Sequence, residues 1–313
     1  MGYAMAAQKI GGSDVIHRIE LGEVTPAAGE VVIEHRAIGI NFIDVYVRTG
    51  VYTGPVESDL ILGSEGAGIV TAVGEGVTHL AVGDRVAYTL RNGAYATHRA
   101  IDASLVVRLP DAIPFETGAA IMLKGLTVTY LMTRSFAVDA GQTILFHAAA
   151  GGVGLLAGQW MKSLGATTIG TAGGPEKCAL AARHGYDHVI DYKAENVTER
   201  VAQITAGAGC DAAYDSVGKD TFASTLASLK MHGTAVAFGQ SSGPYNDFRI
   251  SDLGKGSFHL TRPSVFHFIV DRPWLEQATD LLFSKVIDGS LNIAINQSFA
   301  LEDVAAAHDA LET

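Results

Sequence analysis

The sequence predicts an α/β protein that combines a β-rich part with a doubly wound parallel sheet. Up to about residue 124, short stretches of alternating apolar and polar residues are closely interrupted by Gly and Pro, which is typical of a bent, barrel-like β domain. From about 125 to 265, apolar strands alternate with helices, and this order implies a parallel sheet covered on both faces. Residues 266–313 do not continue the alternation cleanly, which leaves open a return to the first part.

The same patterns place the individual elements. In the first part we expect strands at 30–41, 66–77, 84–90, 94–101 and 105–110. In the second part we expect strands at 142–148, 167–172, 187–192, 210–215 and 233–239, with helices at 152–165, 175–185, 195–207 and 219–230. Beyond 265 we expect a helix at 273–289, a strand at 292–299 and a helix at 301–312.

Composition and charge exclude several classes of protein. Of the 313 residues, 48 % are hydrophobic and 18 % are charged, which is typical of a globular chain with a sizeable core. The net charge, 22 minus 33 or −11, argues against binding to nucleic acid or to anionic membranes. Cys178 and Cys210 form no CxxC pair, so neither a disulfide framework nor a cysteine zinc cluster is expected. Because we find no secretory segment and no apolar run long enough to span a bilayer, we expect a cytoplasmic protein.

A glycine-rich stretch, "HAAAGGVG" at 147–154, follows a buried strand and opens a helix. The dinucleotide-binding pattern G-x-G-x-x-G maps onto Ala149, Gly151 and Gly154, with alanine in the first position. Gly151 and Gly152 let the backbone approach a pyrophosphate, and Gly154 lets the helix pack closely on the strand. The alternative interpretation is a tightly packed strand-to-helix turn without a ligand. The position within a βαβ unit favours a cofactor site.

The tip of the next strand indicates which cofactor is bound. An NAD site usually has Asp or Glu there, whereas this strand ends in Ala172 and Gly173. Lys177 follows closely, and Tyr192 ends the third strand, so both can reach a 2′-phosphate. Lys177 could also be a solvated helix charge, and Tyr192 an ordinary strand end. The pattern nevertheless predicts NADPH.

Eight segments together carry a resemblance to a known family. They are "AIGINFIDVYVRTGVY", "GSEGAGIVTAVGEGV", "VGDRVAY", "LKGLTVTYL", "HAAAGGVG", "YDSVG", "AFGQSSG" and "LTRPS". The chain resembles the medium-chain dehydrogenase/reductase superfamily and, within it, the zinc-free quinone oxidoreductases, the zeta-crystallin-like NADPH:quinone reductases. The resemblance implies a GroES-like catalytic domain built from residues 1–124 and 266–313. A Rossmann NADPH-binding domain, residues 125–265, would be inserted between these two parts.

The residues that hold catalytic zinc in other members of the superfamily are replaced here. Asn41 stands where the first Cys would lie, and Ser64 where the His would be. The segment "MLKGLTV" has no Cys, and the four-cysteine lobe of a structural zinc is missing. Because zinc needs thiolates and imidazoles at ligand spacing, we expect no metal site. His147, beside the glycine loop, is expected to be packed rather than reactive.

The resemblance also assigns roles to individual residues. Asn41, Tyr46 and Tyr52 would form the acceptor side of a cleft between the domains. The blander interpretation makes the two tyrosines half-buried packing residues and Asn41 a turn residue. The nucleotide would be contacted by Thr127, which touches the nicotinamide, and by Ala149, Gly151, Gly152, Val153, Gly154, Gly173, Lys177, Tyr192, Ser216, Phe238, Gly239 and Gln240.

The implied function is NADPH-dependent, zinc-independent reduction of a quinone. A quinone needs far less help from a Lewis acid, because the charge that hydride delivers spreads over an aromatic ring, so positioning could supply most of the catalysis. One alternative is reduction of enone or enal C=C bonds, with Tyr46 or Tyr52 donating a proton. A second is a non-enzymatic NADPH-binding protein of crystallin or RNA-binding type. We also expect a homodimer through an edge strand near 255–263, since pairing would cover an exposed edge.

Overall fold

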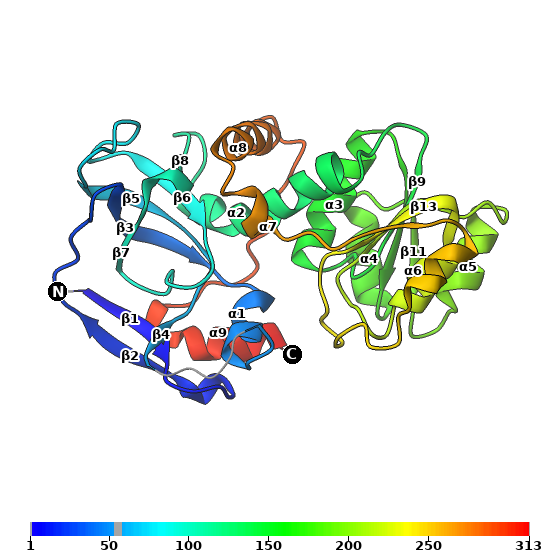
Figure 1. The fold of residues 1–313 in the computed structure, drawn as a ribbon, viewed down its shortest axis with the longest axis horizontal. Coiled ribbons are helices and arrows are strands. Elements are labelled where there is room, and N and C mark those ends of the chain that lie inside the picture. Colours follow the sequence, from blue (N-terminus) through cyan, green and yellow to red (C-terminus); the bar gives the residue numbers. More distant parts are fainter. Residues whose placement is uncertain (1, 53–57, 313) are drawn as a thin grey trace. The chain divides into compact units, whose positions relative to one another are not determined.

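The computed structural model describes residues 2–52 and 58–312, and it divides into two compact units (Figure 1). The first unit comprises residues 1–123, 268–287 and 293–313, and the second comprises 124–267 and 288–292. The chain leaves the first unit after Leu123, re-enters it at Phe268 and passes once more through the second unit at residues 288–292. No described helix has the length and apolar character needed to cross a membrane.

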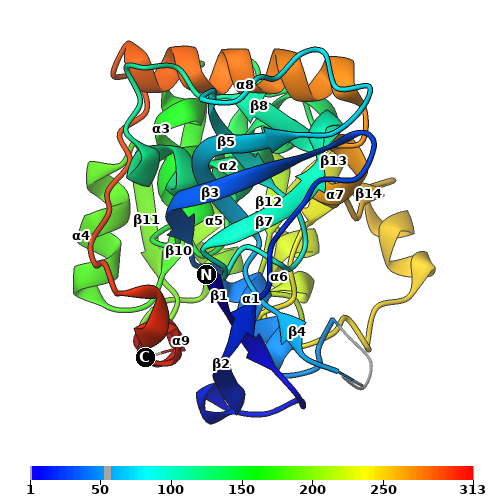
Figure 2. The ribbon, with the colours of Figure 1, turned by 90° about the vertical axis from the view of Figure 1, so that its left-hand side faces the viewer.

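Two antiparallel sheets form the β-rich part of the first unit (Figure 2). The five-stranded sheet has the order β7 (His98–Asp102), β3 (Glu30–Gly39), β5 (Glu65–Val73), β6 (Arg85–Thr89) and β8 (Val106–Arg108). The smaller sheet has the order β2 (Ile16–Leu21), β1 (Gly2–Ala7) and β4 (Leu60–Ile61). Alternating apolar residues such as Val31, Ile33 and Val70 point into one core. Two register shifts between β3 and β5 bend the sheet, which produces the expected curvature.

Four helices of the described chain complete the first unit. They are α1 (Phe42–Arg48), α2 (Phe115–Tyr130), which runs on into the second unit, α8 (Arg272–Ile287) and α9 (Val304–Glu312). A capping box opens α1, because the amide of Asn41 donates to Asp44 Oδ2 at 2.9 Å while the Asn41 side chain accepts from the third residue of the helix. The start of α1 is therefore fixed by its own first turn.

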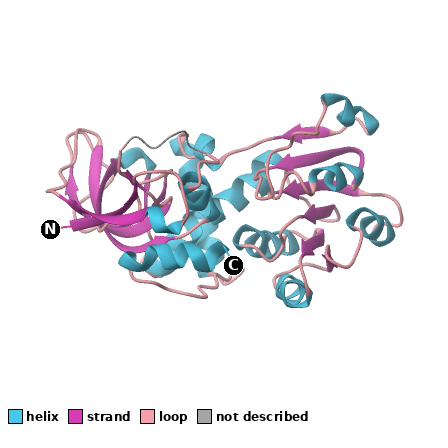
Figure 3. Ribbon diagram, turned by 90° about the horizontal axis from the view of Figure 1, so that it is seen from below, coloured by secondary structure: helices cyan, strands magenta, loops and turns pink. Residues whose placement is uncertain are grey.

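The second unit is a six-stranded parallel sheet with helices on both faces (Figure 3). Its order is β11 (His188–Asp191), β10 (Thr167–Ala172), β9 (Thr143–Phe146), β12 (Cys210–Asp215), β13 (Leu229–Ala237) and β14 (His259–Thr261). The helices are α3 (Gly152–Ser163), α4 (Pro175–Arg183), α5 (Val197–Ile204), α6 (Phe222–Ala227) and the short α7 (Val265–Phe268). Starting at β9, the strands follow the 3-2-1-4-5-6 order of dinucleotide-binding domains. The predicted Rossmann sheet is confirmed, and β14 is one of its edges.

Some sequence expectations were wrong. Residues 292–299 form no strand: most of them are exposed, and the backbone of Asn292 bonds the side chain of Gln159 instead of another strand. The expected helix 219–230 shortens to Phe222–Ala227 because β13 already begins at Leu229. The sequence patterns also did not reveal β1, β2, β4, α1 and α2.

Candidate functional site

The loop after β9 lies where the strand order of the second unit reverses, between β9 and β12. Ala148 turns the chain with a φ of 55°, a strained conformation that costs about 1–3 kcal/mol in a residue other than glycine. The amide of Gly151 bonds the carbonyl of Ala148 at 2.9 Å, and α3 starts at Gly152. Because the first N–H groups of a helix have no acceptor within it, this end of α3 presents donors and a partial positive charge. The arrangement can hold a phosphate group.

The glycines of this loop have different steric reasons to be glycine. A Cβ on Gly154 would run into the carbonyl oxygen of Ala148 and lie 2.7 Å from that of Ala149. A Cβ on Gly152 would lie 2.9 Å from Cδ of Lys124, whose side chain therefore runs along the loop. Gly151 is exposed, and its Cβ would lie 3.2 Å from the carbonyl oxygen of Ala148, closer than an ordinary van der Waals contact. Among the glycines of this loop, only Gly154 has to be glycine because of backbone packing alone. Lys124 is a cation beside the loop that was not predicted from the sequence.

A buried polar cluster lies directly below the loop. His147 Nδ1 is 3.1 Å from Thr171 Oγ1, and its Nε2 is 3.1 Å from Thr225 Oγ1, which donates to Asp215 Oδ2 at 2.8 Å. Burial lowers the pKa of His147, and the neighbouring Asp215 opposes that shift. His147 is fully buried, so it is packed, as expected. The cluster joins β9, β10 and β12 beneath the loop.

Tyr192 and two lysines lie around the tip of β10. A Cβ on Gly173 would lie 2.5 Å from Tyr192 Oη and 3.1 Å from Lys193 Cε, so both side chains pass over this glycine. Lys177 is exposed in the first turn of α4, and Lys193 is exposed beside Tyr192. The nearby carboxylate of Asp191 is already hydrogen-bonded within the protein, because it accepts from the amides of Gly174 and Lys193 at 2.9 and 3.0 Å. Lys193 was missed from the sequence, although its place after Tyr192 could have pointed to it.

The ends of β12 and β13 meet at Ser216 and Gly239. A Cβ on Gly239 would lie 2.5 Å from the carbonyl oxygen of Ser216, and the amide of Phe238 donates to Asp215 O at 2.8 Å. Arg262 holds this loop by donating to Ala237 O at 2.8 Å and to the side chain of Gln240 at 3.2 Å. The predicted residues of this segment are thus close together. Thr127 lies on α2 and is 8 % exposed.

In the first unit, α1 and the residues after it place two tyrosines together. The rings of Tyr46 and Tyr52 are 5.2 Å apart at 75°, and both side chains are half-buried. The amide of Tyr52 donates to Tyr46 O at 3.2 Å, which ties the following loop to the helix. Phe42, 48 % exposed, adds a third ring 6.2 Å from that of Tyr46. This group is an aromatic surface suited to a flat acceptor.

Asn41 occupies a different environment from the tyrosines. It is 6 % exposed, and its Nδ2 donates to Glu65 Oε1 at 2.8 Å. Ser64, the residue after Gly63, is fully buried and donates to Asp44 Oδ1 at 2.5 Å. Both positions that hold metal ligands in zinc relatives are therefore hydrogen-bonded to buried carboxylates. Among residues 2–52 and 58–312, no three His, Cys, Asp or Glu side chains come together to hold a metal ion.

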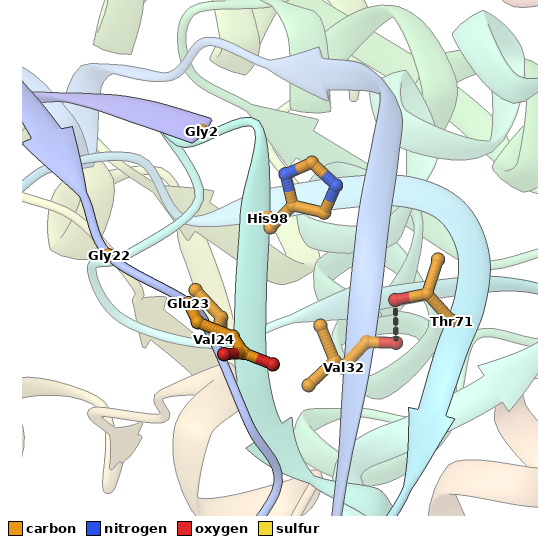
Figure 4. A pocket seen from close by; sticks show the side chains of 7 residues that line it. All are labelled: Gly2, Gly22, Glu23, Val24, Val32, Thr71 and His98. Carbon is orange, nitrogen blue, oxygen red and sulfur yellow. Dashed lines mark hydrogen bonds between the residues drawn. The ribbon is translucent and has the colours of Figure 1, made fainter.

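A pocket elsewhere in the first unit is separate from these groups (Figure 4). Its lining residues are Gly2, Gly22, Glu23, Val24, Val32, Thr71 and His98. The hydroxyl of Thr71 donates to the carbonyl of Val32 at 3.4 Å, as drawn there. None of the residues predicted to bind cofactor or acceptor is among these seven.

Comparison with known proteins identifies the family. Residues 27–111 match the family model of the alcohol dehydrogenase GroES-like domain, and residues 152–284 match that of the zinc-binding dehydrogenases. A quinone oxidoreductase of Salmonella typhimurium is 45 % identical over 309 residues, 97 % of this chain and 94 % of the relative. The chain belongs to the quinone oxidoreductase family. The predicted membership of the medium-chain dehydrogenase/reductase superfamily is confirmed.

Solved structures of quinone oxidoreductases share the whole architecture. The Escherichia coli enzyme complexed with NADPH is 42 % identical with a TM-score of 0.96, covering 99 % of this chain and 96 % of the other. A 2-haloacrylate reductase of Burkholderia sp. is 37 % identical over 97 % of this chain and 94 % of its own. The predicted combination of a GroES-like domain and a Rossmann domain is therefore confirmed, while relatives with different named substrates share it.

Proposed function

We propose that this chain is an NADPH-dependent quinone reductase (EC 1.6.5.-) that works without zinc. The observation that carries the proposal is the pair of lysines and the tyrosine around Gly173, combined with the glycine loop before α3. Family membership supports the same reaction, since the named relatives are quinone oxidoreductases and one is solved with NADPH.

The residues present fit NADPH. The start of α3 presents backbone amides to which a pyrophosphate would bind, and the side chains of Tyr192 and Lys193 lie over Gly173, where the ribose phosphate would bind. Lys177, Tyr192 and Lys193 would bind the 2′-phosphate by charge and hydrogen bonding. Ser216, Phe238, Gly239 and Gln240 would flank the nucleotide, and Thr127 would contact the nicotinamide.

When bound, NADPH supplies the hydride that reduces the acceptor. The chain's own part is to bind, orient and exclude water. Tyr46 and Tyr52 would pack against a planar quinone, with Asn41 at the start of the same helix. This orientation is the main contribution expected of the protein, because a quinone needs little stabilisation of developing charge.

Independence from zinc rests on Asn41 and Ser64, whose side chains are bonded to Glu65 and Asp44. Exhaustive chelation is expected to leave turnover unchanged, and elemental analysis is expected to find no stoichiometric zinc. A tightly bound zinc that is lost together with activity would contradict this proposal.

The direct test of the reaction is an acceptor panel. NADPH oxidation is measured with phenanthrenequinone, benzoquinone and a small enone at equal concentrations. We expect kcat/KM to be highest for a quinone. Turnover of the enone alone would favour the second candidate, reduction of an activated C=C bond, which the likeness to a 2-haloacrylate reductase supports. In that reaction Tyr46 or Tyr52 would donate the proton to the enolate.

A third candidate is an NADPH-binding protein without catalysis, acting in a crystallin-like or RNA-binding role. The net charge of −11 disfavours RNA. Turnover in the panel together with no shift of AU-rich RNA in a gel assay would dismiss it.

The remaining expectations concern assembly, location and domain limits. We propose a homodimer that pairs β14, the edge strand at His259–Thr261, with its copy. Light scattering that gives about 33 kDa at micromolar concentration would contradict the dimer. We further propose a cytoplasmic location, to be tested by cell fractionation. We propose that the functional domains are 1–124 with 266–313 and 125–265, which limited proteolysis would test.

A further inference from the structure

Two buried carboxylates join the start of α1 to the start of β5. Asp44 accepts from Ser64 Oγ at 2.5 Å, and Glu65 accepts from Asn41 Nδ2 at 2.8 Å. Asp44 lies on α1 and accepts from the residue before β5, whereas Glu65 lies on β5 and accepts from the residue before α1. The two hydrogen bonds therefore link these segments in both directions. Asp44 and Glu65 are both fully buried.

Asp44 also accepts hydrogen bonds from other groups of the first unit. Its Oδ2 also accepts from the amide of Asn41 at 2.9 Å and from Tyr95 Oη at 3.1 Å. Burying an ionisable carboxyl is costly unless it is well hydrogen-bonded, and apolar residues of similar size would stabilise such a core at least as well. The arrangement therefore favours a role in fixing geometry over a role in stability.

Hydrogen bonds that share one donor-to-acceptor direction connect Asp44 to the last turn of α1. Since Tyr95 donates to Asp44, its oxygen can accept from Nε2 of His308, 3.0 Å away. Nδ1 of His308 is then free to accept from Arg48 Nη1 at 3.1 Å. Burial and Arg48 lower the pKa of His308 to about 4, which agrees with a neutral ring in this position.

Arg48 is itself the last residue of α1. Its side chain is 2 % exposed and its Nη2 donates to Glu312 at 2.6 Å. The helix is therefore anchored at its first turn through Asp44 and at its last turn through Arg48, and Tyr95 and His308 connect the anchors. A helix of seven residues cannot hold itself in place, because so short a helix is marginal alone.

Tyr46 lies between the two anchors, two residues from each. We propose that Asp44 is a positioning residue for the electron acceptor, which acts by holding α1 so that Tyr46 and Tyr52 keep their edge-to-face arrangement. Asp44 itself touches no substrate. This inference rests on the proposed function, in which the two tyrosines contact the quinone.

The test removes single donors to Asp44 and compares them with a matched change elsewhere in the unit. Tyr95→Phe and Ser64→Ala each delete one hydroxyl that donates to this carboxyl. Tyr88→Phe is the control, because Tyr88 is also fully buried in the first unit and its hydroxyl bonds His35 at 2.7 Å instead. Tm, the Kd for NADPH, and kcat and KM for the quinone are measured for all three variants and the wild type.

We expect Tyr95→Phe and Ser64→Ala to lower kcat/KM for the quinone about fivefold each, equivalent to ~1 kcal/mol. Their Kd for NADPH should stay within twofold of the wild type. Tyr88→Phe should lower Tm comparably and leave kcat/KM unchanged. A Tyr95→Phe enzyme whose kcat/KM matches that of Tyr88→Phe overturns the positioning role alone. A wild type that turns over no quinone overturns the proposed function instead.

Discussion

The two candidate sites of this molecule are built from different materials. In the second unit, the cofactor site consists of a glycine loop, a helix start and exposed cations around Gly173. In the first unit, the proposed acceptor region rests on buried ionisable side chains, with Asp44 and Glu65 at 0 % exposure. A site made from backbone groups depends on the absence of Cβ atoms, whereas a site made from side chains depends on complete hydrogen bonding. Substitutions that add a Cβ should therefore impair the first kind of site, and substitutions that remove a hydrogen-bond donor should impair the second.

The largest effect is expected at Gly154. In Gly154→Ala, the new Cβ would overlap the carbonyl of Ala148 and crowd that of Ala149, both of them backbone atoms that cannot swing aside. Such overpacking costs about 1–3 kcal/mol or more, and it would also distort the start of α3. We expect NADPH affinity to fall more than tenfold in a fluorescence titration.

Gly254→Ala is the matched control for this change. Gly254 lies in the same unit but outside the glycine loop, and no atom lies within 4 Å of the position that its Cβ would take. We expect the NADPH affinity of this variant to match that of the wild type. Equal losses in the two variants would show that the effect of Gly154→Ala does not come from the loop.

The next effect concerns the choice between NADPH and NADH. Removing Lys177 or Lys193 would take away the charge-assisted contact that we propose to the 2′-phosphate, worth about 1.5–3 kcal/mol and less at an exposed position. Lys177→Ala and Lys193→Ala should each weaken NADPH binding by about tenfold and barely change NADH. Titration of both cofactors measures this.

Lys230→Ala is the control for the two lysine variants. Lys230 pairs with Asp211 near the amino ends of β13 and β12, away from the carboxyl ends that carry the site. It should bind both cofactors like the wild type. If Lys193→Ala weakens NADH as much as NADPH, Lys193 serves the loop and not the phosphate.

The contrast between the sites also explains what the sequence could predict. The cofactor loop is a contiguous pattern, because Ala149 to Gly154 lie between a strand and a helix that adjoin them in the chain. The acceptor region depends on partners far apart in sequence: Asn41 bonds Glu65, and Arg48 bonds His308, 260 residues away. No local pattern encodes such pairs, so Asp44, Tyr95 and His308 were not predicted.

Elements were missed or misplaced for related reasons. Strand β1 has four consecutive buried residues, so it lacks the alternation that reveals a half-buried strand. Residues 292–299 do alternate, yet alternation supplies no neighbouring strand, and Ile295 and Phe299 are 44 % and 45 % exposed. A strand needs a partner as well as a pattern.

The last effect expected is a pH dependence of the stability of the first unit. Burial raises the pKa of Asp44 from 3.8 to about 7, while bonds from Ser64, Asn41 and Tyr95 oppose the shift. The folded state then holds a proton between about pH 4 and pH 7 that the unfolded chain has lost. The free energy of unfolding should therefore fall as pH rises through this range, by at most ~1.4 kcal/mol per pH unit.

The two tryptophans allow this slope to be assigned to one unit. Trp274 lies in the first unit and Trp160 in the second, so a Trp160→Phe background leaves fluorescence that reports the first unit. Burial lowers the pKa of His35 to about 4, so this residue makes the free energy of unfolding rise with pH below pH 6.5, opposite to the effect of Asp44. The contribution of Asp44 is therefore obtained by comparing proteins with and without this residue. Urea unfolding is measured from pH 5 to 8 in the Trp160→Phe background, with and without Asp44→Asn. The free energy of unfolding should fall towards pH 7 in the protein that keeps Asp44, and this fall should be absent from the Asp44→Asn variant. Parallel curves for the two proteins would mean that Asp44 is ionised throughout this range, and that its hydrogen bonds offset the whole cost of burial.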